Sequence, residues 1–453
     1  MSARRNKSRD THKKMKNHRP HIRLDNNKIV PLDQATVLDG EEILNNYASL
    51  GSAGNIFVSN AYLDFEVRSG QISYVNDVFL NVDINNGNAV NQLAIAPIQY
   101  LISFIEIFVG ADLIETIYPT QLWTDLCNYD NGQIDNIEKA CGFGHQNNVC
   151  DFTAGPPVVF YDGAHFDTGN GTILGSYAYP ETRIPVSTTR SYVMKIPSTW
   201  LSSGHLLLDH LSETLRVRVH FESGDNIFDT FTPAVQRVVG AGGISLQQAQ
   251  LIVKGIKLGP KALSQALDRA QSNETVIKSY VHRRQIINAG ALTAGVENSE
   301  TLTGFNGEFD YLEIFQRNAN ATNEERWLTN HTTGADQSRF EITTSTLLDG
   351  SGQPWGYQNL QNDSLLRYWI QPDNYDGCEF NRYFPVYQLS FSGDPKGDQK
   401  TGKKDHGQAY MDGLWRFTYT PENNITNAEL IIHGKQAMNI TISKNGKFQA
   451  HYL

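Results

Sequence analysis

The recurring pattern along this chain is an alternation of apolar and polar residues, which is typical of β-strands with one buried face. The clearest case is LRVRVHF at residues 215–221, in which every second side chain is apolar and the others are basic. Residues 78–84, VFLNVDI, also carry valine, leucine or isoleucine at every second position. Because successive side chains of a strand point to opposite faces, both stretches predict strands.

The stretch Tyr100–Tyr118 predicts a β-hairpin. Its two apolar runs, Leu101–Ile107 and Leu113–Ile117, are rich in aromatic and β-branched residues, which favours strand over helix. Between them lies the short turn Gly110-Ala111-Asp112, in which Gly110 can adopt the positive φ that a tight reversal requires. One face of this hairpin is expected to be well buried.

Strand-like runs separated by turns continue to the end of the chain, and one short helix interrupts them. The further predicted strands are Ile56–Val67, Tyr192–Pro197, Ile244–Leu258, Val276–Gln285, Phe309–Gln316, Arg339–Thr344, Leu365–Ile370, Tyr387–Phe391, Leu414–Thr420, Glu429–His433 and Ala437–Ser443. Residues Lys261–Ser272 carry apolar side chains on one side and predict the helix. Turns rather than helices separate the strands, so we predict two all-β halves built as antiparallel sandwiches and joined near residues 225–275.

Composition supports a folded chain with more than one core. The 453 residues are 40% hydrophobic and 19% charged, and that length exceeds one ordinary core. Four cysteines are too few for a disulfide scaffold and favour a reducing compartment. No apolar segment follows the basic N-terminal residues, so we expect no secretory signal.

Charge is distributed unevenly between the N-terminus and the rest of the chain. Residues 1–23 hold one acid and nine basic residues, about +8, whereas the whole chain carries −10, which leaves −18 for the remainder. The basic residues are Arg4, Arg5, Lys7, Arg9, Lys13, Lys14, Lys16, Arg19 and Arg23. We interpret residues 1–23 as a disordered basic arm that contacts nucleic acid or another anionic inner surface, the alternative being a solubilising or localisation tail.

A phosphate-binding loop is nearly matched by Gly397, Gly402 and Lys403. The next residue is Lys404, however, and not the serine or threonine that would ligate magnesium. The segment that follows does not predict the helix whose N-terminus would hold a phosphate. A charged hairpin loop is therefore the better interpretation.

Other candidate chemistry is equally incomplete. The spacing of Cys141, His145 and Cys150 matches no zinc motif. His165 and His205 each lie near aspartates, but no nucleophile motif accompanies them. We accordingly predict no catalytic residues, no metal site and no cofactor.

Four stretches, in this order, resemble a known family. They are Phe104–Gly110 with Leu113–Tyr118, Tyr192–Leu201, Leu215–Phe221, and Gly304–Leu312 with Arg317. Over residues 55–453 the chain resembles the double jelly-roll major capsid proteins of icosahedral double-stranded DNA viruses. That lineage includes adenovirus-type hexons, tailless membrane-containing phages, and large and Polinton-like DNA viruses. The second stretch lacks the Pro-Leu-Pro-Phe-Trp run of the large-virus members, which leaves the subfamily open.

The resemblance implies an all-β fold of two antiparallel eight-stranded jelly rolls in tandem, with long loop insertions and a short helix between or beside them. The implied division is an arm at 1–23, a first roll at 24–235 and a second roll at 236–453. Insertions at 127–190 and 317–385 would form an outer tower. In this setting the acids of the hairpin are expected to face solvent or a subunit: Glu106, Asp112 and Glu115.

The resemblance also implies a structural function without enzymatic activity. The expected protein is a major capsid protein that trimerises into pseudo-hexagonal capsomers of a virion shell, assembled inside the host cell. Its implied partners are further copies of itself, penton and minor capsid proteins, and the viral genome or an inner membrane, with a host receptor left open. The alternative is a carbohydrate- or receptor-binding tandem β-sandwich, for which six tryptophans supply candidates: Trp123, Trp200, Trp327, Trp355, Trp369 and Trp415.

Overall fold

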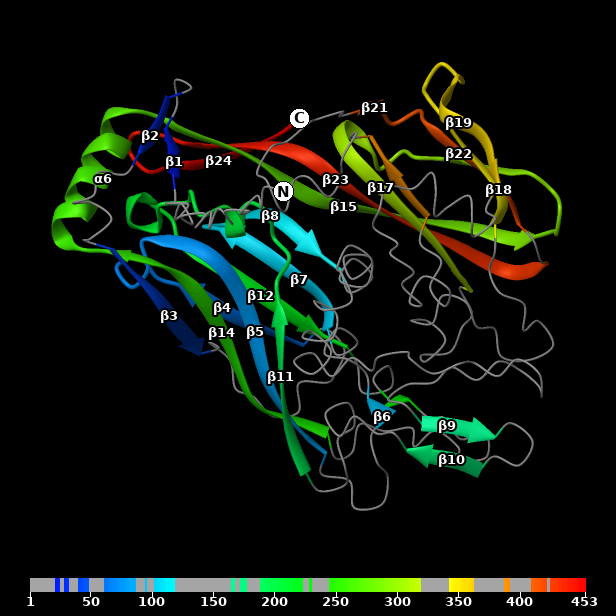
Figure 1. Ribbon diagram of the computed structural model, residues 1–453, viewed down its shortest axis with the longest axis horizontal. Helices are drawn as coiled ribbons and strands as arrows, with labels where there is room; N and C mark the ends of the chain where they lie inside the picture. Colours follow the sequence, from blue (N-terminus) through cyan, green and yellow to red (C-terminus); the bar gives the residue numbers. More distant parts are fainter. Residues whose placement is uncertain are drawn as a thin grey trace, which may run out of the picture.

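The structure is a computed structural model dominated by antiparallel strands (Figure 1). It describes residues 21–24, 28–31, 40–48, 61–86, 94–95, 102–118, 164–167, 172–176, 188–222, 228–229, 244–318, 342–361, 387–391, 409–421 and 424–453. Within these ranges the α-helix is α6, Pro260–Ser272, and two short 3-10 turns are η1, Leu201–Ser203, and η2, Leu208–His210.

The first roll consists of two four-stranded sheets. One has the order β11-β5-β14-β3, formed by Thr188–Lys195, Tyr74–Asn86, Ile244–Leu258 and Gly40–Ala48. The other has the order β4-β12-β7-β8, formed by Tyr62–Val67, Leu215–Phe221, Ile102–Val109 and Asp112–Ile117. Every pairing is antiparallel, and the apolar faces of both sheets meet in one core. The prediction of an eight-stranded first roll is thus confirmed.

The second roll pairs a larger sheet with a four-stranded one. The larger sheet has the order β15-β23-β17-β20, with β21 added to β17 and β24 to β23. Its strands are Thr275–Leu292, Ile425–Ile442, Asn306–Asn318, Tyr387–Ser390, Ala409–Asp412 and Phe448–Tyr452. The smaller sheet has the order β16-β22-β18-β19, formed by Asn298–Thr301, Arg416–Pro421, Ile342–Leu348 and Pro354–Gln361. A second core, which includes Phe305, Phe309 and Phe417, lies between them.

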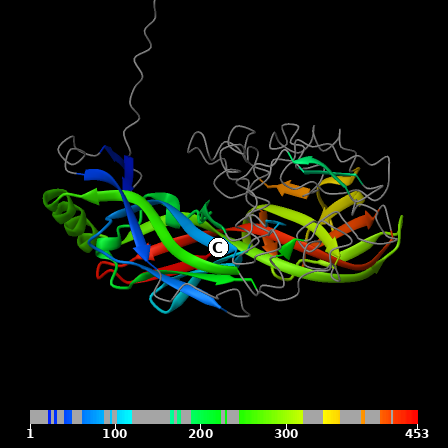
Figure 2. The same ribbon diagram turned by 90° about the horizontal axis from the view of Figure 1, so that it is seen from below.

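Two strands reach both cores. β15 and β23 have 18 residues each, enough to extend about 60 Å, and they pair along nearly their whole length. Val281 and Met438 belong to the core of the first roll, whereas Leu292 and Leu430 belong to that of the second. Figure 1 shows the pair running from above the first roll into the second, and Figure 2 shows the two rolls side by side. The rolls are therefore joined by shared strands as well as by surface contact.

Three two-stranded sheets complete the described strands. They are β1 with β2 (His21–Leu24 and Lys28–Pro31), β6 with β13 (Ala94–Ile95 and Phe228–Asp229), and β9 with β10 (Ala164–Asp167 and Thr172–Ser176). The β9–β10 pair shows that the predicted insertion at 127–190 contains strands as well as loops. The second predicted insertion, 317–385, contains β18 and β19 of the four-stranded sheet.

Several local predictions are confirmed. The hairpin is β7–β8, and its turn residue Gly110 has a φ of 62°. Predicted strands 215–221 and 244–258 coincide with β12 and β14. The predicted helix begins one residue earlier, at Pro260. Its apolar side packs on Tyr74 and Leu207 through Ala266, Leu267 and Ala270.

Two sequence predictions need correction. Residues 429–433 and 437–443 were predicted as separate strands, but both belong to β23, because pairing with β15 continues through Gly434. A Cβ at Gly434 would lie 2.6 Å from the Phe305 ring, so the glycine accommodates an aromatic neighbour and does not end the strand. The predicted division at residue 235 also differs from the sheet pairing, since β14 pairs with β5 and β3 of the first roll.

The basic arm falls largely outside the described residues. Its last residues, including Arg23, lie in β1, so the predicted disorder does not extend over all of residues 1–23. β1 pairs with β2 in a short antiparallel sheet.

The β23–β24 turn docks on the first roll, and Gly446 permits this close approach. Gly446 has a φ of 81°, and a Cβ there would lie 2.1 Å from the carbonyl oxygen of His210. The backbone N–H and hydroxyl of Ser212 both donate to the Gly446 carbonyl, at 2.9 and 3.1 Å. The turn thus joins sequence positions more than 200 residues apart.

We expect Gly446→Ala to lower the free energy of unfolding by about 3 kcal/mol, because backbone strain and a steric clash add together. Gly295→Ala is the matched control, since Gly295 has a φ of 72° and no atom lies within 4 Å of its Cβ position. That control should cost only about 1 kcal/mol. Denaturant titration of both variants measures the difference, and equal losses would show that the docking contact contributes nothing.

Candidate functional site

The sequence-predicted arm residues are mostly outside the described part of the chain. Arg4, Arg5, Lys7, Arg9, Lys13, Lys14, Lys16 and Arg19 all precede residue 21, and Arg23 lies in β1. Their contact with an anionic surface stays a prediction.

The other candidate residues are not brought together as a site. Gly397, Lys403 and the group Cys141, His145 and Cys150 lie outside the described residues, and His165 lies in β9. Within the described ranges, no three residues of metal-ligating type are grouped so that they could hold an ion. No described helix is long and apolar enough to cross a membrane.

His205 and Asp209 have separate structural surroundings. Burial lowers the pKa of His205 below its ordinary value. Asp209 accepts a hydrogen bond from the backbone N–H of Gly70 at 2.6 Å, across the surface of the first roll. This carboxylate orders a turn, and the pair therefore gives no indication of catalysis.

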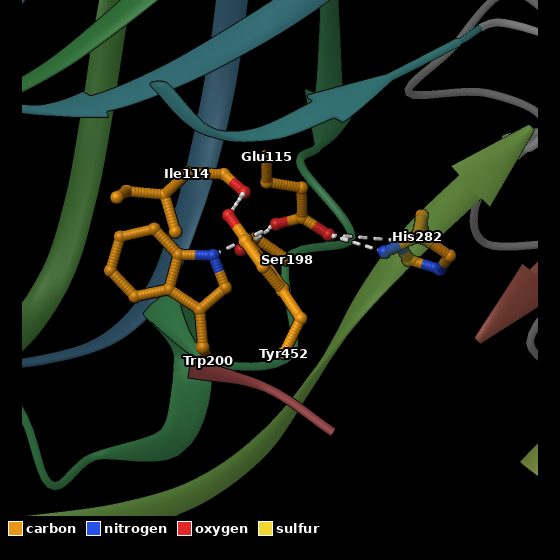
Figure 3. A network of polar contacts seen from close by, with 6 residues as sticks. All are labelled: Ile114, Glu115, Ser198, Trp200, His282 and Tyr452. Atoms are coloured by element: carbon orange, nitrogen blue, oxygen red, sulfur yellow. Dashed lines mark hydrogen bonds and ion pairs between the residues drawn. The ribbon is translucent and has the colours of Figure 1, made fainter. Parts of the chain in front are cut away.

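The most developed polar site lies at the seam between the two rolls, where β8 meets β15 and the segment Ser198–Trp200 (Figure 3). The side chain of Glu115 is fully buried there. Its Oε2 accepts hydrogen bonds from the Ser198 hydroxyl at 2.6 Å and from the Trp200 indole N–H at 3.0 Å. Its Oε1 accepts from the backbone N–H of His282 at 3.2 Å, and His282 Nδ1 lies 3.0 Å away. Four donors thus converge on one carboxylate.

Aromatic and cationic side chains strengthen the same seam. The guanidinium of Arg284 lies 3.5 Å from the ring centre of Tyr118, just beyond β8. Arg283 lies 4.3 Å from the ring centre of Tyr452 in β24. The Tyr452 hydroxyl donates to the carbonyl of Ile114 at 2.9 Å. Strand β8 of the first roll is consequently held by two strands of the second-roll sheet.

The combination of Ser198, His282 and Glu115 has the residue types of a hydrolytic triad, but its geometry does not suit that chemistry. In a triad the histidine accepts the serine proton, whereas here the Ser198 hydroxyl donates to Glu115. All three residues are buried, at 1, 8 and 2% exposure respectively. A substrate could not reach the hydroxyl without separating the rolls, so the arrangement is structural.

The seam corrects one sequence expectation. Glu115 was expected to face solvent or a subunit, and this was wrong, because it lies between the rolls. Asp112 is exposed, as expected, and Glu106 is partly exposed and pairs with His220 at 2.9 Å. The only signal in the sequence was an acid inside the apolar run Leu113–Ile117. Its partners could not be identified because they lie 83 to 167 residues away.

The tryptophans offer little support for a glycan cleft. Trp200 and Trp415 are buried in the two cores, at 0 and 4% exposure. Trp355 is 44% exposed and packs against Trp415 and Phe391. Trp123, Trp327 and Trp369 lie outside the described residues.

Comparison with known proteins shows that this chain is similar in fold to several solved structures. No protein-family model matches the sequence, and no curated protein matches it. A chain of the PBCV-1 virus capsid superposes with a TM-score of 0.61 at 13% identity, over 91% of this chain and 97% of its own. The Faustovirus major capsid protein gives 0.56 at 12% identity over 93% of each chain. A chain of the Sputnik virophage gives 0.52 at 12% identity, over 99% of this chain and 93% of its own.

These neighbours are viral major capsid proteins, and the chain has their double jelly-roll fold. The match extends over nine tenths or more of the chain, so it includes both rolls and their arrangement. The double jelly-roll fold implied by the four sequence stretches is confirmed, and the second roll has ten described strands where eight were expected.

We expect Glu115→Gln to lower the free energy of unfolding by about 3 kcal/mol, because the amide NH2 would face donors and the buried charge would be lost. Glu66→Gln is a control on the same sheet, since Glu66 is partly exposed and lies 3.9 Å from Arg68. That variant should stay within about 0.5 kcal/mol of the parent. Denaturant unfolding measures both, and a neutral Glu115→Gln would show that the hydrogen bonds of the seam add no stability.

Proposed function

We propose that this chain is a major capsid protein, a structural subunit of an icosahedral virion shell. The observation that carries the proposal is the tandem pair of jelly rolls joined by β15 and β23, matched over nearly the whole chain by viral capsid proteins. A shell subunit must keep its edges in fixed relative positions while neighbours bind to them. Shared strands and a buried polar seam suit that requirement.

In this proposal three copies assemble into a capsomer. Each copy contributes two rolls, so three copies present six rolls around a pseudo-hexagonal axis. Neighbouring capsomers, penton proteins and minor capsid proteins are the expected partners at its edges. The virion is the expected location, with assembly inside the host cell.

The arm is proposed to face the interior of the shell. Residues 1–23 carry about +8 and the remainder of the chain −18, so the arm would be attracted to an anionic genome or membrane leaflet while the body would not. The contribution of each basic residue would be electrostatic and independent of nucleic-acid sequence.

A non-enzymatic role is consistent with the seam, because Ser198 and His282 there contact the buried carboxylate of Glu115. A carbohydrate-binding sandwich was the alternative from sequence. Two of its candidate tryptophans, Trp200 and Trp415, pack in the cores. Nothing in the described residues favours carbohydrate binding.

The trimer is tested by the mass of the purified protein in solution. Light scattering should give about three times the chain mass of 50.7 kDa. A mass of one chain that persists at high protein concentration would contradict the capsomer. Negative-stain images of the same sample should show pseudo-hexagonal particles.

The arm is tested by deleting residues 1–20, which keeps β1 and Arg23 in place. We expect the trimer to remain and the affinity for DNA to fall by at least tenfold at low salt, because each lost phosphate contact weakens binding. Filter binding at several salt concentrations should also show a shallower salt dependence for the truncated protein. If the truncated chain no longer forms trimers, the arm is part of the subunit contact instead.

A further inference from the structure

A cluster of basic side chains lies in the larger sheet of the second roll, close to the seam. His433 of β23 pairs in register with Arg284 of β15 on one side and with Glu313 of β17 on the other. His282 lies two residues from Arg284 on β15. His433 and Glu313 are 1 and 2% exposed and therefore buried, whereas Arg284 is partly exposed.

The cluster is connected directly to the first roll. His282 Nδ1 lies 3.0 Å from the Glu115 carboxylate of β8, and Arg284 stacks on Tyr118 at the end of the same strand. A change of charge on β23 would therefore act on the residues that hold β8.

The surroundings of His433 disfavour its protonated form. Burial is the main cause that holds the pKa of His433 well below its ordinary value, and the charges of Arg284 and His282 lower it further. The facing acids are Glu313 on β17 and, beyond His282, Glu115 on β8. Burial outweighs these facing acids, since the pKa of His433 remains lowered.

We propose that the seam between the rolls is an acid-sensitive latch, in which uptake of a proton at His433 releases the hold of β15 on β8. The added charge would lie beside Arg284 and His282 in a buried place. The structure can relieve it by letting His282 move away from Glu115 and admitting water. The device concerns the subunit itself and does not depend on assembly into a shell.

The direction of the pH dependence follows from the lowered pKa. In the unfolded chain a histidine takes up a proton below about pH 6.5. His433 in the folded protein does not, so the unfolded state binds more protons as the pH falls. Its contribution to stability is present above about pH 6.5 and is lost progressively below it.

The role of proton uptake at His433 is tested by measuring the unfolding of the full-length protein between pH 8 and pH 5. Below about pH 6.5 the unfolding equilibrium constant of the parent should rise up to tenfold more per pH unit than that of His433→Gln, since one titrating group is removed. His451→Gln is the matched control, because His451 is exposed on β24 and should leave the parental pH dependence unchanged. Equal pH dependence of the parent and His433→Gln would overturn the proposal.

Hydrogen exchange of the parent protein tests whether β8 is released at low pH. This experiment does not depend on the folding of any variant. After correction for intrinsic exchange, protection of β8 should fall by up to about tenfold between pH 7.5 and pH 5.5, because a single proton is taken up, while β12, in the same sheet, stays protected. Loss of protection in both strands together would show ordinary global unfolding and would contradict a latch at the seam. Unchanged protection in β8 would contradict it as well.

Discussion

The pairing of β15 with β23 is the contact on which the rest of the molecule depends. Both strands carry apolar side chains into the core of the first roll at one end and into that of the second at the other. Such strands cannot leave one core without disturbing the other, because the same backbone hydrogen bonds run through both. This coupling makes two sandwiches of ordinary size behave as one subunit, which an isolated surface contact between domains would not ensure.

The polar seam adds specificity to this apolar framework. A buried carboxylate is costly unless donors surround it, and Glu115 receives them from both rolls. An apolar contact would tolerate sliding of β8 along β15, whereas four directed hydrogen bonds fix one position. The Arg284–Tyr118 contact adds a second connection across the seam, and Arg283 packs on Tyr452, whose hydroxyl donates to the Ile114 carbonyl of β8. The buried His433 makes the arrangement sensitive to protons, since the histidine is held in its neutral form.

Side-chain chemistry and position must be considered together to interpret this site. Serine, histidine and glutamate lie within hydrogen-bonding reach, yet the direction of the Ser198 bond and the burial of all three give them a structural role. Two of the tryptophans, Trp200 and Trp415, likewise have a structural role, since they fill the two cores.

The sequence by itself determined strands such as β12 and β14, with their alternating buried faces, and the short helix, because these depend on residues two or four positions apart. Residues 215–221, the Gly110 turn and Lys261–Ser272 were all identified in this way. The tertiary structure alone decided that β14 joins the first roll, that Gly434 lies inside one long strand, and that Glu115 is buried. Each of these depends on a neighbour far away in the chain. A period of two shows which face is apolar, but it does not show which element will cover that face.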